Sequence, residues 1–121
     1  MKLHLLNRSS AEDTSLTVSH NLYSHFLKIW HFHEEFELVL IIQSSGIRFV
    51  GDHIGEFDID ELVLIGKDLP HMWMNDKKYF TENSTLKAEA IAIHFKRAFL
   101  GDTFFQVPEM APIGQLSLIH I

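Results

Sequence analysis

Hydrophobic residues occur along this chain in short segments, each about as long as a β-strand. The segments are rich in Val, Ile, Leu, Phe and Trp, and turn-forming Gly, Ser, Asp and Pro residues separate them. Many short strands at such spacing indicate a β-sandwich or a β-barrel. The predicted strands are 23–33, 36–43, 46–50, 61–65, 69–74 and 86–95.

The segment 86–95 has a second interpretation. Its Ala, Leu, Lys and Glu residues favour a helix, whereas Ile91 and Ile93 alternate with small residues, as in a strand. We predict a strand. After Lys96 the apolar residues recur every three to five positions, which indicates two short C-terminal α-helices around breaks at Gly101 and Pro108.

A chain of 121 residues has room for one core. The polar stretch 7–15 predicts a loop, so residues 1–15 are assigned to an N-terminal segment. Residues 16–96 form the predicted barrel, and residues 97–121 a helical dimerisation or linker segment. A helix begun near Glu109 has only about a dozen residues left, which is close to the minimum length for a marginal helix. We therefore expect the chain to be truncated.

Charge and composition exclude several functions. With 10 basic and 16 acidic residues the net charge is -6, which repels phosphate backbones, so we expect no nucleic-acid binding by this fragment. The absence of Cys excludes disulfides and thiolate chemistry and suits a reducing compartment. The longest aliphatic run, 38–42, is far shorter than the roughly 20 residues of a membrane span. We predict a cytoplasmic protein without a membrane partner.

One face of the predicted strand region carries two imidazoles and a carboxylate, those of His31, His33 and Glu37. His71 from another strand would complete a shell of three His and one carboxylate. These ligands suit a divalent ion such as Zn, Ni, Mn or Fe. Glu35 has the same parity as Glu37 and is an alternative carboxylate ligand. The same four residues are also the centre of a predicted ligand-binding site.

Two further residues are candidates for ligand binding. Trp73 shares the face of His71 and is either a platform for a sugar or aromatic ligand or a core residue. Arg48 lies within the central strands and either pairs with a ligand carboxylate or is an exposed strand residue. His94 follows no ligand pattern, and we assign it no role. Motifs for phosphate loops, nucleophile elbows and H-E-x-x-H helices are absent, and no catalytic residue is assigned.

The spacing His31-x-His33-x-x-x-Glu37, and the later Pro70-His71-x-x-x-Asn75, resemble the two cupin signatures. A Pro-His pair after the strand 60–65 further resembles the N-terminal sensor domain of AraC-type transcriptional regulators, as does the segment 93–110. The resemblance covers about residues 20–116. It implies a mainly β fold, a cupin-like antiparallel β-barrel or jelly roll that binds a small-molecule effector and forms a homodimer. It also implies that the complete protein continues into helix-turn-helix units that bind DNA.

Three functions remain open. The first is an effector-sensing and dimerisation domain of an AraC-type regulator whose DNA-binding part is absent from this chain, with a sugar as one candidate effector. The second is a small metal-dependent cupin enzyme, a dioxygenase or isomerase, and the third is a carbohydrate-binding module. The helical spacing after residue 96 favours the first, as does the lack of a distinguishable general acid or base. We therefore predict a protein that is not an enzyme.

Overall fold

Alternation of side chains between two faces defines the longest strands. The computed structural model of the chain describes residues 3–5, 16–26, 28–96, 98–101, 103–112 and 118–120. In β9 (Ala88–Phe95), Ala90, Ala92 and His94 are buried, and the residues between them are partly exposed. This is the period-two pattern of a strand with one face toward a core. The helical interpretation of this segment is therefore excluded.

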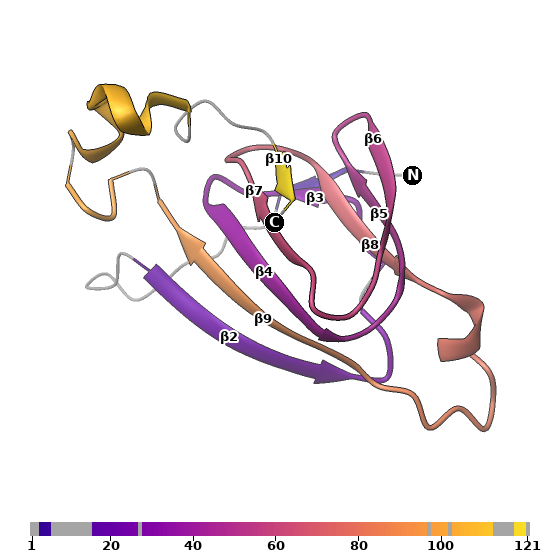
Figure 1. Cartoon of the computed structure of the whole chain (residues 1–121). Coiled ribbons are helices and arrows are strands. Elements are labelled where there is room, and N and C mark those ends of the chain that lie inside the picture. The colour runs from indigo at the N-terminus through magenta and orange to yellow at the C-terminus, as the bar shows by residue number, and fades with distance from the viewer. Residues whose placement is uncertain are drawn as a thin grey trace.

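Two five-stranded sheets face each other across the core (Figure 1). The first has the order β1 (His4–Leu5), β3 (His31–Phe32), β8 (His71–Asn75), β5 (Gly46–Val50) and β6 (His53–Phe57). The second has the order β10 (Leu118–His120), β7 (Leu62–Ile65), β4 (Phe36–Gln43), β9 and β2 (Leu16–Tyr23). Neighbouring strands are antiparallel, except that β1 runs parallel to β3. Among the described residues the two sheets do not join into one closed barrel, so the molecule is a sandwich with cupin-like strands.

The core lies between the inner faces of the sheets. Residues of β4, β7 and β9 pack against residues of β5, β6 and β8. Within the first sheet, Trp73 packs edge-on against Phe57 at a ring-centroid distance of 5.1 Å. The buried hydrophobic residues of this cluster are Val39, Ile41, Val50, Phe57, Val63, Ile65, Trp73, Ala90 and Ala92. The register of β4 against β9 places Glu37 opposite His94, and Val39 opposite Ala92. Polar and apolar inward residues therefore form separate rows across the second sheet.

The predicted strands agree with the structure where the pattern is strongest. β4 and β5 have the predicted ends, and β7, β8 and β9 begin and end within two residues of the prediction. The prediction of a strand over 23–33 is wrong, because in that range β2 ends at Tyr23 and only His31–Phe32 forms a strand of its own.

Four strands escaped prediction, the short β1 and β10 and the longer β2 and β6. In β2 the pattern is inverted, since apolar Val18 and Leu22 are exposed while polar Ser19 and Asn21 lie on the opposite, less exposed face. β6 contains Gly55 and carries mostly exposed side chains. Neither segment has the apolar inner face that marks a strand in the sequence.

The two predicted C-terminal α-helices are not supported. The described part of 97–121 contains two 3-10 turns, Phe104–Gln106 and Pro108–Met110, followed by two α-helical residues at 111–112. Gly101, with φ +105, and Pro108 interrupt the helical spacing, and the described residues of this segment contain no helix of several turns. The predicted loop over 7–15 lies outside the described residues. No helix among the residues described is long and apolar enough to cross a membrane.

Candidate metal centre

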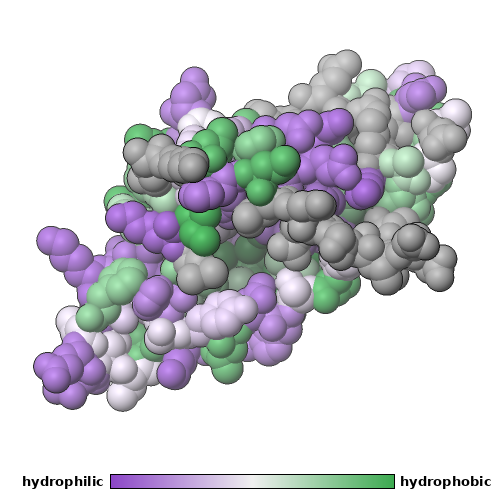
Figure 2. Space-filling view, turned by 180° about the vertical axis from the view of Figure 1, so that it is seen from behind, coloured by the Kyte–Doolittle hydropathy of each residue, from purple (hydrophilic) through white to green (hydrophobic). Residues whose placement is uncertain are grey.

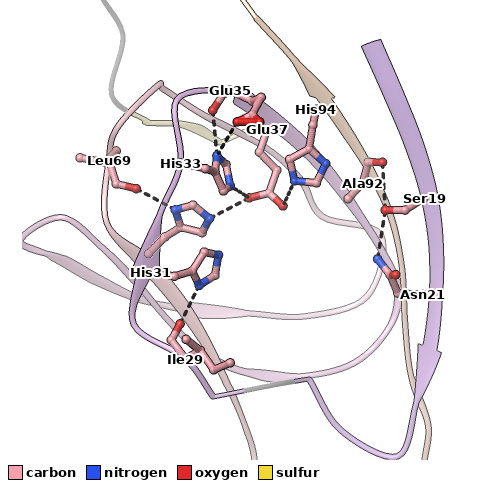
Figure 3. Close-up of polar contacts among 11 residues, drawn as sticks. Ser19, Asn21, Ile29, His31, His33, Glu35, Glu37, Leu69, Ala92 and His94 are labelled. Atoms are coloured by element: carbon pink, nitrogen blue, oxygen red, sulfur yellow. Dashed lines mark hydrogen bonds and ion pairs between the residues drawn. The ribbon is translucent and has the colours of Figure 1, made fainter. Parts of the chain in front are cut away.

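Four histidines and one glutamate converge inside one end of the sandwich. His31 is in β3 and His71 in β8, directly paired with each other in the first sheet, while Glu37 and His94 are paired in the second. His33 lies in the short connection from β3 to β4. All are buried except His31, which is half-buried. Figure 3 shows the rings of His33 and His94 directed toward the carboxylate of Glu37.

Backbone carbonyls orient three of these rings through hydrogen bonds to their Nδ1 atoms. The Nδ1 atoms lie 2.7 Å from the oxygen of Ile29 for His31, 3.0 Å from that of Glu35 for His33, and 2.7 Å from that of Leu69 for His71. A carbonyl only accepts, so each Nδ1 carries a proton, and in the neutral form of the ring Nε2 keeps its lone pair. Histidine ligands of metals are typically oriented by such a hydrogen bond on the opposite ring nitrogen.

Glu37 lies at the centre of the cluster. Its Oε2 is 2.9 Å from His71 Nε2 and 3.7 Å from His33 Nε2, and its Oε1 is 3.0 Å from His94 Nε2. Each residue of the group His31, His33 and His71 offers one ligand atom, and these lie within 4.8 Å of one another. The same holds for His33, Glu37 and His94. The two groups share His33, so they form one continuous centre.

The mutual contacts shift the pKa values of these residues. Burial by itself would raise the pKa of Glu37, but the contacts with His33, His71 and His94 outweigh it and hold that pKa well below its usual value. Burial would likewise lower the pKa of His71, but the contact with the Glu37 carboxylate raises it. Burial and the nearby charge of His71 lower the pKa of His31 to about 4. Near neutral pH the centre therefore contains an anionic carboxylate and a neutral His31.

The residues present fit a divalent metal ion. The Nε2 atoms of His33 and His71 and the Oε2 atom of Glu37 are buried, yet within the described structure none has a hydrogen bond of acceptable geometry. Buried polar atoms are normally satisfied, so three such atoms directed at one point call for an explanation. Three imidazoles and a carboxylate are ligands that Zn, Ni, Mn and Fe accept. His31, His33, Glu37 and His71 are the residues that could hold the ion.

The geometry of the centre differs from the one expected from strand parity. His31 and Glu37 were predicted to share one face of one strand, but they belong to opposite sheets and approach each other across the interior. Glu35, the alternative carboxylate, is buried rather than solvated, and its Oε2 lies 3.9 Å from Nδ1 of His33, on the side away from the cluster. Glu37 is therefore the carboxylate that faces the other ligands.

His94 belongs to the centre although the sequence did not indicate it. The strand β9 points Ala88, Ala90, Ala92 and His94 inward, and the register with β4 places His94 beside Glu37. The only signal in the sequence was that His94 shares the parity of the small inward residues of β9. A pairing partner cannot be read from one strand alone, so the register was needed to recognise this residue.

A cavity of about 120 Å³ adjoins the centre. Trp73 lines it and is also part of the core, so the core interpretation of this residue is confirmed, whereas its role as a platform for a ligand stays a prediction. Near the middle of the face shown in Figure 2, hydrophobic side chains are visible in a hollow between hydrophilic ones. The residues that line the cavity are Asn21, Phe26, Glu37, Val39, Ile41, Trp73, Ala90 and Ala92.

Arg48 is buried rather than exposed, but it does not line this cavity. Its Nη1 donates to Oε2 of Glu61 and to the carbonyl oxygen of Glu56, both at 2.9 Å. The guanidinium therefore connects β5 to β6 and to the residue that precedes β7. Its place in the structure is that of a buried ion pair.

Comparison with solved structures identifies the fold. No known family model matches the chain, and no curated protein matches it. A cupin protein from Bacteroides fragilis superposes with a TM-score of 0.56 at 17% identity, covering 80% of this chain and 88% of that one. The chain has the cupin fold. A cupin 2 conserved barrel domain protein from Salinispora arenicola gives a TM-score of 0.55 at 12% identity, covering 78% and 75%. A third, from Rhodopseudomonas palustris, gives 0.52 at 14%, covering 72% and 56%.

Proposed function

We propose that this cupin domain senses a small molecule and is the effector-binding part of an AraC-type transcriptional regulator. The observation that carries the proposal is the cavity beside Glu37, which lies inside the sandwich next to the histidine cluster. An apolar cavity with a few converging polar groups is the usual form of a small-molecule site. The sequence motifs around His33 and Pro70-His71 supply the likeness to regulators.

Each part of the site has a distinct task in this proposal. His31, His33, Glu37 and His71 would hold a divalent ion, which would supply a Lewis acid for an oxygen atom of the effector. The backbone carbonyls behind the three rings keep their Nε2 atoms directed inward before anything binds. Phe26 and Trp73 line the cavity, and their rings would displace water from a bound effector and lower the dielectric around its polar contacts.

The gene itself tests the regulator assignment. We expect the natural reading frame to continue past Ile121 by about a hundred residues with two helix-turn-helix units and a basic charge balance, which DNA binding requires. The measurement is the sequence of the native transcript, followed by a reporter assay of the full protein. In that assay His33→Ala should abolish the effector response, whereas the exposed His53→Ala should retain it. A native stop codon close to Ile121 would contradict the regulator assignment.

A metal-dependent cupin enzyme is the second candidate, and the anchored rings of His31, His33 and His71 favour it. Preorganised ligands with open positions are what a catalytic metal needs. Oxygen consumption by iron-loaded protein with a panel of aromatic and enolic acids would separate the two functions. Turnover that His71→Ala eliminates would establish an enzyme, whereas binding without turnover supports a sensor.

We also propose that the domain forms a homodimer. The outer face of the second sheet carries exposed Val18 and Leu22 on β2 and Leu40 on β4. Exposed apolar surface of this kind marks an interaction face. Analytical ultracentrifugation should show a dimer, and Val18→Lys should convert it to a monomer. The control Ile54→Lys alters an equally exposed residue of β6 and should leave the dimer intact. A wild-type monomer at high concentration would contradict this proposal.

A further inference from the structure

We infer that the cavity takes a compact, mostly apolar molecule, about the size of an aromatic ring, with a single oxygen-bearing head group directed at Glu37. The inference rests on the proposed small-molecule site and narrows its ligand class. It excludes sugars and other polyols, which the sequence left open as effectors. Three features of the described structure support it: the order of the lining residues, their polarity, and the small residues that create the space.

The lining residues form rows across the second sheet. The register pairs Glu37 with His94, Val39 with Ala92, and Ile41 with Ala90. On the other side of β9, Asn21 of β2 pairs with Ala90. At 3.3 Å per residue, the row of Ile41 lies about 13 Å along the strand from Glu37. The cavity therefore runs from the metal centre at one end toward the carboxamide of Asn21 at the other.

The charged and amide side chains of this lining, those of Glu37 and Asn21, lie at its two ends. Between them the lining consists of Val39, Ala92 and other apolar residues, together with Trp73, whose indole N–H is a single donor. A polyol bound here would bury several hydroxyl groups with nothing to pair with, which is costly. One head group can be satisfied at the Glu37 end. The aromatic rings of the lining suit a flat or hydrocarbon body.

Alanines create the space. Ala90 and Ala92 face inward beside the bulkier Val39 and Ile41 of the same sheet. The ring of Trp73 lies on the opposite sheet. A cavity of 120 Å³ is slightly smaller than the dry cavity of about 150 Å³ that accommodates benzene in another protein. The cavity therefore accepts one ring or a short chain, and any larger side chain at Ala92 would take the place of the ligand.

The test uses a Trp30→Phe protein, in which Trp73 is the single tryptophan and reports on the cavity. Zinc affinity is measured first by calorimetry. The zinc-loaded protein is then titrated with benzoate and with D-glucose, and the metal-free protein with benzyl alcohol. We expect benzoate and benzyl alcohol to change the Trp73 fluorescence, and D-glucose to leave it unchanged.

Ala92→Leu should weaken benzoate and benzyl alcohol binding by at least about tenfold, because the added methyl groups fill the space. Zinc affinity should change less than about threefold, since Ala92 is not a ligand. The matched control is Ala98→Leu, which makes the same change at an exposed position. If Ala92→Leu does not fold, Ala90→Val fills less of the cavity, and the comparison of benzoate with glucose needs no variant.

The outcomes separate this inference from the proposed function. Binding of D-glucose in place of benzoate would overturn the inference and leave a sensing site in place. Binding of benzyl alcohol without any zinc affinity would support the inference and remove the metal from the proposed function. If none of the probes binds either form, or if Ala92→Leu binds benzoate as tightly as the control, the inference is wrong, while the reporter assay still decides the regulator function.

Discussion

Two groups of charged residues are buried in this sandwich, and they differ in what their atoms face. In the candidate metal centre, the Nε2 atoms of His33 and His71 and one oxygen of Glu37 are directed at one another without hydrogen bonds of acceptable geometry. In the second group, Nη1 of Arg48 donates to Glu61 and to a backbone carbonyl, although Nε of Arg48 also lacks a hydrogen bond among the described residues. Both groups carry charge and lie largely in the interior, with the Glu61 side chain 21% exposed.

The difference shows that buried charge alone does not identify a site. The contacts of Arg48 bind strands together, as an ion pair with extra hydrogen bonds can do. The Nδ1 atoms of the histidine rings are hydrogen-bonded to the carbonyls of Ile29, Glu35 and Leu69. The direction of each Nε2 atom is therefore fixed. A set of lone pairs held toward one point is suited to an ion or ligand rather than to stability. The predictions below separate these two roles.

Arg48→Ala should produce the largest loss of stability. Breaking a buried ion pair costs about 3–5 kcal/mol, and we expect about 3 kcal/mol because the Glu61 side chain is 21% exposed. The measurement is urea unfolding. The control Lys67→Ala removes an exposed pair with Asp68 and should cost less than about 1 kcal/mol. Folded Arg48→Ala should bind zinc as the wild type does, and a large loss of zinc affinity would place Arg48 in the metal centre.

His71→Ala should produce the largest loss of zinc affinity, by more than about 100-fold. Mutation of a residue that only orients a metal ligand typically lowers metal affinity about 10- to 100-fold. His71 is proposed as a ligand itself, so its loss should cost more. Competition with a chromogenic chelator measures the affinity, with the exposed His53→Ala as control. Equal affinities of the two variants would show that His71 serves only the contact with Glu37.

His94 should have an intermediate effect, because its Nε2 lies 3.0 Å from Oε1 of Glu37 and turns the other oxygen toward His71. His94→Ala should weaken zinc binding about 10- to 100-fold. His94→Gln keeps an N–H donor and should recover most of that loss. If the glutamine variant recovers nothing and the Cu²⁺ EPR spectrum loses a nitrogen coupling, His94 is itself a ligand.

Over one pH unit, the pH dependence of zinc affinity should be the smallest of these effects. The ion requires neutral imidazoles, and the Glu37 carboxylate raises the pKa of His71. Below that raised pKa, affinity should fall about tenfold per pH unit, while His31, with a pKa of about 4, contributes only in strong acid. The stability of the zinc-free protein should depend on pH in the opposite direction. Protonated His71 stabilises the fold at low pH, and this contribution to the free energy of unfolding is lost as the pH rises through the raised pKa of His71. Zinc affinity independent of pH would contradict the arrangement.

The strands that the sequence predicted well are those whose apolar residues face the core. Val39 and Ile41 in β4, and Val50 in β5, sit in the hydrophobic cluster between the sheets, and their alternation is visible in the chain. β2 was missed because its apolar side chains face outward and its polar ones line the interior. A local pattern records only which face is apolar, and it does not record which face is buried.

The sequence by itself determined the mainly β character and drew attention to His31, His33, Glu37 and His71 through their residue types and spacing. Only the tertiary structure decided that these residues meet across two sheets, that His94 joins them, and that Arg48 pairs with Glu61. The physical reason is that spacing along a strand fixes the side on which a residue points. Which residue it meets depends on strand register and on the packing of the opposite sheet, and both arise only when the whole chain folds.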